Sequence, residues 1–457
     1  MNIRFVRSLL LSAALLLPAY AAETALDRYV AAPDPNYKYE LVSKIAGEGY
    51  TAYVLEMTSQ QWRTAAEVNQ PVWKHWLTIV RPDQVSTTTG FLYITGGSMR
   101  DKAPTKADGM IVTLALATHS VTAELRMVPN EPLVFAGETR QRSEDAIIAY
   151  TWDKYLKGGD DQWPLRLPMT KSAVRALDTI TAFSKTAAGG QVDVDKFVVS
   201  GGSKRGWTAW TTAAVDRRVI AVVPFVIDLL NIVPSFDHHY RAYGFWAPSV
   251  KDYVDEHVME QSGTPRYKKL MKIVEPYEYR DRLTMPKYML NAAGDQFFLP
   301  DSSQFYYPGL KGEKYLRYVP NTNHSMQNSD ARESLQAFYE SVVSGTPRPK
   351  FAWKFEKDGS IRVNSQTKPI EVKLWQATNP KTRDFRLEKI GKAYTSAVLT
   401  ETKPGVYVGK VPKPVEGFTA YFVEMTYPGN AKTPFKFTSG VRVLPDVLPF
   451  PSPRKKK

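Results

Sequence analysis

Residues Lys196 to Trp210, KFVVSGGSKRGWTAW, constrain the fold of this chain more than any other stretch. The strand-like residues 197–200 run into Gly201, Gly202 and Ser203, and a helix-like run follows at once. A buried strand that turns tightly into a helix is the setting that activates a serine nucleophile. The turn exposes the hydroxyl, and the first N–H groups of the helix can stabilise an oxyanion. Ser203 is therefore the first candidate for a catalytic residue.

The match of this stretch to the general pattern G-x-S-x-G is incomplete. Arg205 stands where the second glycine is expected, and Gly206 follows one residue later. The alternative interpretation is a serine at an ordinary strand-to-helix turn. A catalytic role for Ser203 would require an acid and a histidine at suitable positions later in the chain.

The first 21 residues predict a secretory signal peptide. Arg4 and Arg7 precede an apolar run at residues 9–17, and Ala19-Tyr20-Ala21 has the small-x-small pattern of a cleavage site. The apolar run is too short to span a bilayer, and no later apolar stretch reaches that length. We therefore expect cleavage after Ala21 and a periplasmic or secreted protein that is not transmembrane.

The chain contains no cysteine, and its six histidines lack the spacing of a metal site. Disulfides, cysteine nucleophiles and thiolate zinc sites are therefore excluded, which fits a bacterial periplasmic protein, and neither metal nor cofactor is expected. The formal charge of +14 falls to +12 without Arg4 and Arg7, and part of it lies in a basic tail at 451–457. Such a charge favours an anionic envelope surface as a partner. No nucleic-acid motif is present.

Strand and helix patterns alternate from about residue 73 to residue 343, which predicts a mostly parallel sheet with helices on both faces. The segment 50–57 is a possible edge strand, and 91–95 is a buried strand ending in Gly96, Gly97 and Ser98. We expect an oxyanion donor from Gly97 or Ser98, beside the backbone N–H of Lys204. The other expected strands are 73–80, 121–128, 196–200, 219–227, 287–292 and 314–319. The expected helices are 108–119, 143–155, 169–183, 334–343 and one between 295 and 314.

Ser203, Asp295 and His324 each follow a predicted strand, in the chain order Ser, Asp, His. That is the layout of an α/β-hydrolase triad, in which the serine attacks, the histidine takes and returns its proton, and the aspartate orients the histidine. Asp228, which also follows a strand, is the rival acid.

Two further segments complete the predicted organisation. Residues from about 228 to 285 are too long for a simple crossover and are expected to cap the strand ends of an α/β-hydrolase-like domain at 22–346. From 347 to 450 short alternating segments replace the strand-helix rhythm. They predict a C-terminal all-β sandwich of the immunoglobulin or fibronectin III kind.

Long motifs resemble the PhoPQ-activated pathogenicity-related protein family from about Thr24 to Phe450. They include GGSKRGWTAWTTAAVDRRV, FDHHYRAYGFWAP and EPYEYRDRLTMPKYMLNAAGDQFF. An arginine at the position of Arg205 is usual in that family. The resemblance implies an α/β-hydrolase fold with a β-rich C-terminal part. It also implies an association with virulence and with resistance to antimicrobial peptides, but it brings no defined substrate.

Two functions follow as hypotheses. The first is an exported serine hydrolase that cleaves an ester or peptide bond of a small-molecule or peptide substrate. A peptidase needs carboxylates for the substrate amine, and the candidates near the expected cleft are Glu144, Asp145, Asp160, Asp161 and Asp237. The second is a non-enzymatic protein of hydrolase fold that binds an anionic envelope or host component. Arg205 is expected to be a buried cation paired with an acid.

Overall fold

The computed structural model describes residues 23–429 and 433–453, so the predicted signal peptide and the four basic residues of the tail lie outside it. Within these two ranges, none of the helices has the length and apolar character that a membrane span requires.

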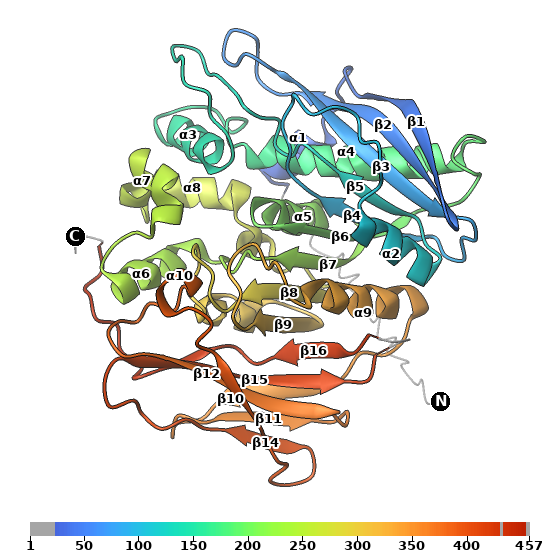
Figure 1. Cartoon of the computed structure of the whole chain (residues 1–457). Helices are drawn as coiled ribbons and strands as arrows, with labels where there is room; N and C mark the ends of the chain where they lie inside the picture. Colours follow the sequence, from blue (N-terminus) through green and yellow to red (C-terminus); the bar gives the residue numbers. More distant parts are fainter. Residues whose placement is uncertain (1–22, 430–432, 454–457) are drawn as a thin grey trace, which may run out of the picture.

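Most described strands join into one 14-stranded sheet, shown in Figure 1. The strand order is β1-β2-β3-β5-β4-β6-β7-β8-β9-β16-β15-β12-β13, and β17 pairs with β15. The strands of the N-terminal part are β1 (Lys38–Gly47), β2 (Tyr50–Gln61), β3 (Val72–Pro82), β4 (Thr89–Ile94), β5 (Thr122–Leu125), β6 (Lys196–Gly202), β7 (Val219–Phe225), β8 (Lys287–Ala292) and β9 (Lys314–Val319).

The core of this sheet is parallel. Strands β5, β4, β6, β7, β8 and β9 run in the same direction, whereas β1, β2 and β3 join antiparallel at one side. The loops that follow β6, β8 and β9 therefore leave the sheet at the same edge. This arrangement confirms the predicted α/β class, with a mostly parallel central region covered by helices on both faces.

Helices cover both faces of the parallel strands (Figure 1). Phe197 and Val199 of β6 pack in one core cluster with residues of α4 and α5, while Val198 packs in the other with residues of α2 and α9. Because successive side chains of a strand point to opposite faces of the sheet, an apolar strand such as β6 needs a layer of helices on each face to bury them. The helices of this part are α1 (Ala25–Ala31), α2 (Gly109–Thr118), α3 (Asp145–Leu156), α4 (Arg166–Lys185), α5 (Lys204–Val215) and α9 (Ala331–Ser344).

Short helices fill the segment between β7 and β8, which the sequence predicts to be a cap. In Figure 1, α6 and α7 lie at the same side of the molecule as α3. The helices of this segment are α6 (Ile232–Tyr243), η1 (Pro248–Val250), α7 (Lys251–Asp255), η2 (Met259–Gln261), α8 (Pro265–Val274) and η3 (Pro276–Tyr279).

Two sequence-based expectations are wrong. The segment 50–57 belongs to β2, which is an interior strand. It pairs with β1 on one side and with β3 on the other, so β1 forms the edge of the sheet. The helix expected between Asp295 and β9 is replaced by two 3-10 turns, η4 (Ser302–Phe305) and η5 (Tyr307–Gly309). Pro308 lacks the N–H that a continuing helix needs at this point.

The C-terminal part is built of strands, as predicted, but its main strands extend the central sheet. Thr438 of β16 pairs with Leu316 of β9, so the sheet crosses from one part of the chain into the other. A second, three-stranded sheet has the order β10-β11-β14. The likeness to an immunoglobulin or fibronectin III sandwich stays a prediction. The elements are β10 (Phe351–Phe355), β11 (Ile361–Ser365), β12 (Glu371–Asn379), α10 (Leu387–Ile390), β13 (Thr395–Val398), β14 (Val406–Gly409), β15 (Phe418–Tyr427), β16 (Phe435–Thr438) and β17 (Arg442–Leu444).

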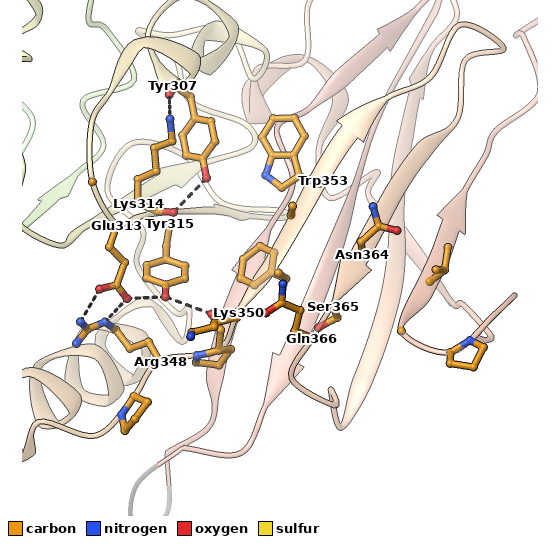
Figure 2. A pocket seen from close by; sticks show the side chains of 18 residues that line it. Tyr307, Glu313, Lys314, Tyr315, Arg348, Lys350, Trp353, Asn364, Ser365 and Gln366 are labelled. Carbon is orange, nitrogen blue, oxygen red and sulfur yellow. Dashed lines mark hydrogen bonds and ion pairs between the residues drawn. The ribbon is translucent and has the colours of Figure 1, made fainter.

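A hollow of about 900 Å³ lies where β10 and β11 meet the segment before β9 (Figure 2). Arg348 donates to both oxygens of Glu313, at 2.6 and 2.7 Å, and the Tyr315 hydroxyl donates to Glu313 at 2.6 Å. Tyr307 stacks on Trp353 at 5.5 Å between ring centroids. These contacts pair Glu313 with Arg348 and Tyr315, and they join the two parts of the molecule at the Tyr307–Trp353 stack.

Candidate active site

Ser203 occupies the turn between β6 and α5 in a strained backbone conformation. Its φ is 54° and its ψ is −125°, a region that residues other than glycine rarely adopt. The Ser203 N–H donates to the carbonyl of Phe225 at 2.8 Å, and this bond holds the turn against β7. The side chain is half-buried, and its hydroxyl has no hydrogen-bond partner among the described residues. The predicted nucleophile thus sits in the geometry of a nucleophile elbow.

Two glycines allow this turn to form. A Cβ atom on Gly201 would lie 2.7 Å from the carbonyl oxygen of Arg205, and one on Gly206 would lie 2.9 Å from that of Gly201. Both distances are shorter than real Cβ contacts. The second glycine of this elbow therefore stands one residue later than in the general pattern, because Gly206 is the position where helix and strand touch.

Asp295 and His324 form a hydrogen-bonded pair on the loops after β8 and β9. His324 Nδ1 lies 2.8 Å from Asp295 Oδ2, while Asp295 Oδ1 accepts the N–H of Phe297 at 2.7 Å. The His324 side chain is 15 % exposed and that of Asp295 is 3 % exposed. With Nδ1 facing the carboxylate, Nε2 is left to accept a proton from a nucleophile.

Aromatic rings connect this pair to Ser203. Phe297 and Phe298 contact the His324 ring, with centroid distances of 4.4 and 5.9 Å, and both also line the cavity that Ser203 lines. Phe297 and Phe298 therefore contact the imidazole and also border the cavity, whose lining includes Ser203 but not His324.

Asp228, the rival acid, points elsewhere. Its two oxygens accept the hydroxyls of Tyr306 and Tyr318, at 2.5 and 2.7 Å, and the side chain is buried. Burial raises the pKa of Asp228 to about 8. A carboxyl group that is neutral at pH 7 and engaged by two tyrosines does not suit the role of orienting a histidine.

The three backbone N–H groups expected to bind an oxyanion differ in whether they already donate a hydrogen bond. The backbone N–H of Lys204, at the first position of α5, has no acceptor among the described residues, and neither has that of Gly97. The N–H of Ser98 donates to Asp101 Oδ2 at 3.0 Å. Lys204 and Gly97 are therefore the two donors that remain available to a developing oxyanion.

Arg205 is a buried cation paired with an acid, as the sequence predicts. It donates to both oxygens of Glu144, at 2.9 and 2.8 Å, and to the carbonyl of Val128 at 2.5 Å. Burial disfavours the charged form of Glu144, but Arg205 and Lys204 outweigh it and lower the pKa of that carboxyl. Burial raises the pKa of Glu131, which accepts the N–H of Glu144 at 2.6 Å.

The cavity beside Ser203 is small and aromatic, with a volume of about 30 Å³. Asp145, Arg166 and Lys204 bring charges into it, and Ile232, Phe236, Val250 and Tyr253 come from the segment between β7 and β8. Its other lining residues are Trp152, Trp207, Ile227, Leu229, Phe297 and Phe298.

The five carboxylates considered for a substrate amine are not gathered at this cavity. Asp145 lines it, but its oxygens face Lys204 Nζ at 3.1 Å and the Tyr253 hydroxyl at 2.9 Å. Glu144 pairs with Arg205, as described above. The other three lie away from the lining: Asp160 pairs with Arg63, Asp161 is exposed, and Asp237 faces Arg241.

Sequence reasoning missed Arg166, a buried residue of the cavity wall at the start of α4. The signal was present as an arginine inside the apolar run WPLRLP, directly before the amphipathic helix. Such a pattern also fits a solvated first turn, so it does not distinguish a buried cation from an exposed one.

The C-terminal part holds the loops of the acid and the histidine. Leu387, the first residue of α10, donates its N–H to the carbonyl of Gly294 at 2.9 Å, and Gly294 donates to Thr322 at 3.0 Å. Asn321 exchanges two hydrogen bonds with the backbone of Tyr394, both at 2.9 Å. The neighbours of Asp295 and His324 are thus fixed from outside the hydrolase-like part.

Comparison with known proteins identifies the family. The sequence profile of the PhoPQ-activated pathogenicity-related proteins matches residues 26–386. The chain belongs to this family. The resemblance read from its motifs is therefore confirmed. This chain is also similar to a protein of Dictyostelium discoideum named autocrine proliferation repressor protein A. That protein is 39% identical over 475 residues, which cover 97% of this chain and 95% of the relative.

Solved structures also resemble this family member. Acetyl xylan esterase 1 from a Thermoanaerobacterium species has 15% sequence identity and a TM-score of 0.49, covering 70% of this chain and 92% of the esterase. The acylaminoacyl peptidase of Pyrococcus horikoshii has 12% identity and a TM-score of 0.40, covering 67% and 49% of the two chains.

Proposed function

We propose that this chain is an exported serine hydrolase of carboxylic esters, in which Ser203, His324 and Asp295 form the catalytic triad. The observation that carries the proposal is the strained backbone of Ser203, with φ 54° and ψ −125°, at the start of a helix whose first N–H is free. Strain of this kind persists where the surrounding structure holds a functional group in place. The Asp295–His324 pair supplies the base that such a serine needs.

The proposed reaction has two stages. Ser203 Oγ attacks the ester carbonyl while His324 Nε2 takes the hydroxyl proton, and Asp295 stabilises the imidazolium through Nδ1. The N–H groups of Lys204 and Gly97 receive the oxyanion. His324 then protonates the departing alcohol, and a water molecule activated by the same histidine hydrolyses the acyl-enzyme.

The charges around Ser203 favour ester over peptide substrates. A peptidase that recognises a free amino terminus needs a carboxylate with no other cation, but Lys204 Nζ lies 2.5 Å from Glu144 and 3.1 Å from Asp145. Both carboxylates are therefore already paired with a cation of the protein itself.

The test is turnover of p-nitrophenyl esters and of dipeptide amides by the wild type and by triad variants. We expect the wild type to cleave esters, and Ser203→Ala, His324→Ala and Asp295→Asn to lose roughly 10³-fold or more in kcat. Matched controls are Ser396→Ala and His257→Ala, which alter exposed residues and should keep wild-type rates.

Other outcomes would overturn parts of the proposal. Cleavage of amides but not esters would contradict the ester assignment, and wild-type rates in the triad variants would contradict the triad. No turnover, together with salt-sensitive binding of lipopolysaccharide by the wild type and Ser203→Ala alike, would favour the non-enzymatic function instead.

A further inference from the structure

Arg166 is a buried cation without a direct ion pair at the wall of the Ser203 cavity, although Asp145 and Glu275 attract it from a longer distance. It is 4 % exposed, and no described carboxylate lies within ion-pair distance of its guanidinium. Burying an unpaired charge is costly, and natural interiors avoid it unless something compensates. Burial lowers the pKa of Arg166, as expected for a cation with little solvent. The position therefore requires an explanation beyond packing.

The guanidinium is held next to the nucleophile. Its Nη1 donates to the carbonyl of Lys204 at 2.9 Å, one residue from Ser203, and its plane lies over the Trp207 ring with 4.6 Å to the centroid. Its Nε is buried and has no hydrogen-bond partner in the described part of the chain. The side chain is thus fixed at one corner and keeps unused donors.

The other cations near the cavity have direct carboxylate partners, whereas Arg166 has no described carboxylate within ion-pair distance. Lys204 Nζ is paired with Glu144 and Asp145, and Asp145 also accepts the Tyr253 hydroxyl. Arg205 is engaged by Glu144. A small anion entering the cavity would meet a guanidinium with spare donors, without having to displace an existing ion pair.

The size and position of the cavity indicate which part of a substrate enters it. A water molecule needs about 10–15 Å³ by the same measure, so 30 Å³ admits a group the size of a carboxylate. Ser203 and Lys204 line the cavity, and so do Phe297 and Phe298, which contact the His324 ring. A group bonded to the carbonyl that Ser203 attacks can therefore reach this cavity, with Arg166 in its wall.

We infer that Arg166 is the anion-binding residue of an acyl pocket, so that the preferred substrates are esters whose acyl group ends in a carboxylate. This inference rests on the proposed esterase function and adds the substrate class. Arg166 acts as a specificity-determining residue, because it recognises the far end of the acyl group while the triad acts on the ester bond.

The experiment follows ethanol release from two ethyl esters of equal length, the hemisuccinate and the succinamate, which end in a carboxylate and a neutral amide and whose ethoxide group the neighbouring carboxylate does not readily displace. We expect the wild type to prefer the hemisuccinate by at least about tenfold in kcat/KM, as a charged hydrogen bond predicts. Arg166→Gln should reduce that ratio to near one. Arg175→Gln should keep it, because Arg175 lies on the same helix but pairs with Asp178 away from the cavity.

The outcomes separate this inference from the function on which it rests. Equal turnover of the two esters, or preference for the amide, would overturn the acyl pocket and leave the esterase intact. No turnover of either ester and no labelling of Ser203 by a fluorophosphonate would overturn the proposed function itself. If Arg166→Gln does not fold, the wild-type ratio decides, together with competitive inhibition by free succinate but not by succinamide.

Discussion

Three residue-level features place the candidate chemistry at Ser203. Its own backbone is strained, the Asp295–His324 pair is formed, and the first N–H of α5 at Lys204 is free. Asp228 differs from Asp295, because its buried carboxyl group accepts hydrogen bonds from two tyrosine hydroxyls and none from any described histidine. Similar residues after neighbouring strands thus have different roles, set by what surrounds them.

Asp228→Asn should change how stability depends on pH. The Asp228 pKa is about 8 in the folded protein against 3.8 for an unperturbed aspartate, so the folded state loses stability as pH rises from about 4 to about 8. The variant lacks this titration and should gain stability relative to the wild type across that range, with no further change above it. Urea unfolding at pH 4, 6, 8 and 9 measures the difference. Parallel curves for the two proteins would show that Asp228 is not held neutral.

At the scale of elements, the join of β6, Ser203 and α5 is the part that the sequence predicts best. Each pattern in this stretch predicts the same local structure. The apolar run predicts a buried strand, the two glycines predict a tight turn, and the amphipathic run predicts the helix that follows. The strand β1 was missed because its alternation of exposed and half-buried residues is that of a weakly apolar edge. Arg166 was missed because burial of a helix's first turn depends on the segment packed over it, which lies far along the chain.

Gly206→Ala should damage the elbow. The new methyl group would lie 2.9 Å from the Gly201 carbonyl oxygen and 3.0 Å from Ile227 Cγ2, so backbone must move. We expect a loss of about 1–3 kcal/mol in the free energy of unfolding, with reduced ester turnover. Gly109→Ala is the matched control, since its Cβ meets nothing within 4 Å and it begins α2. Thermal melting of both variants decides, and equal melting temperatures would contradict the packing argument.

At the scale of the whole molecule, the C-terminal part is tied to the hydrolase-like part by buried charges as well as by the shared sheet. Arg383 donates to Asp301 at 2.6 Å, and His238 lies 3.0 Å from the same carboxylate. The side chains of Arg383 and Asp301 are 2 % and 5 % exposed. The sequence predicts strands in this region, but it does not show that they continue the central sheet, because the single pairing of Thr438 with Leu316 joins distant residues.

Arg383→Met should therefore destabilise the whole chain. Removal of the guanidinium leaves Asp301 buried without its strongest partner, and the expected cost is about 3 kcal/mol in the free energy of unfolding. Lys410→Met serves as the control, because its pair with Asp358 is exposed and its loss should leave the melting temperature unchanged. A single cooperative transition shifted to lower temperature would show that the two parts unfold together. Separate transitions, with the first part unchanged, would contradict their coupling.

The most direct test of the account is the site of covalent labelling by a fluorophosphonate, mapped by mass spectrometry of proteolytic peptides. The account predicts one adduct, on Ser203 of the native wild type, and none on Ser203→Ala or on heat-denatured protein. Absence of an adduct on the folded wild type, or an adduct on another serine such as Ser98, would contradict the assignment of Ser203 as nucleophile.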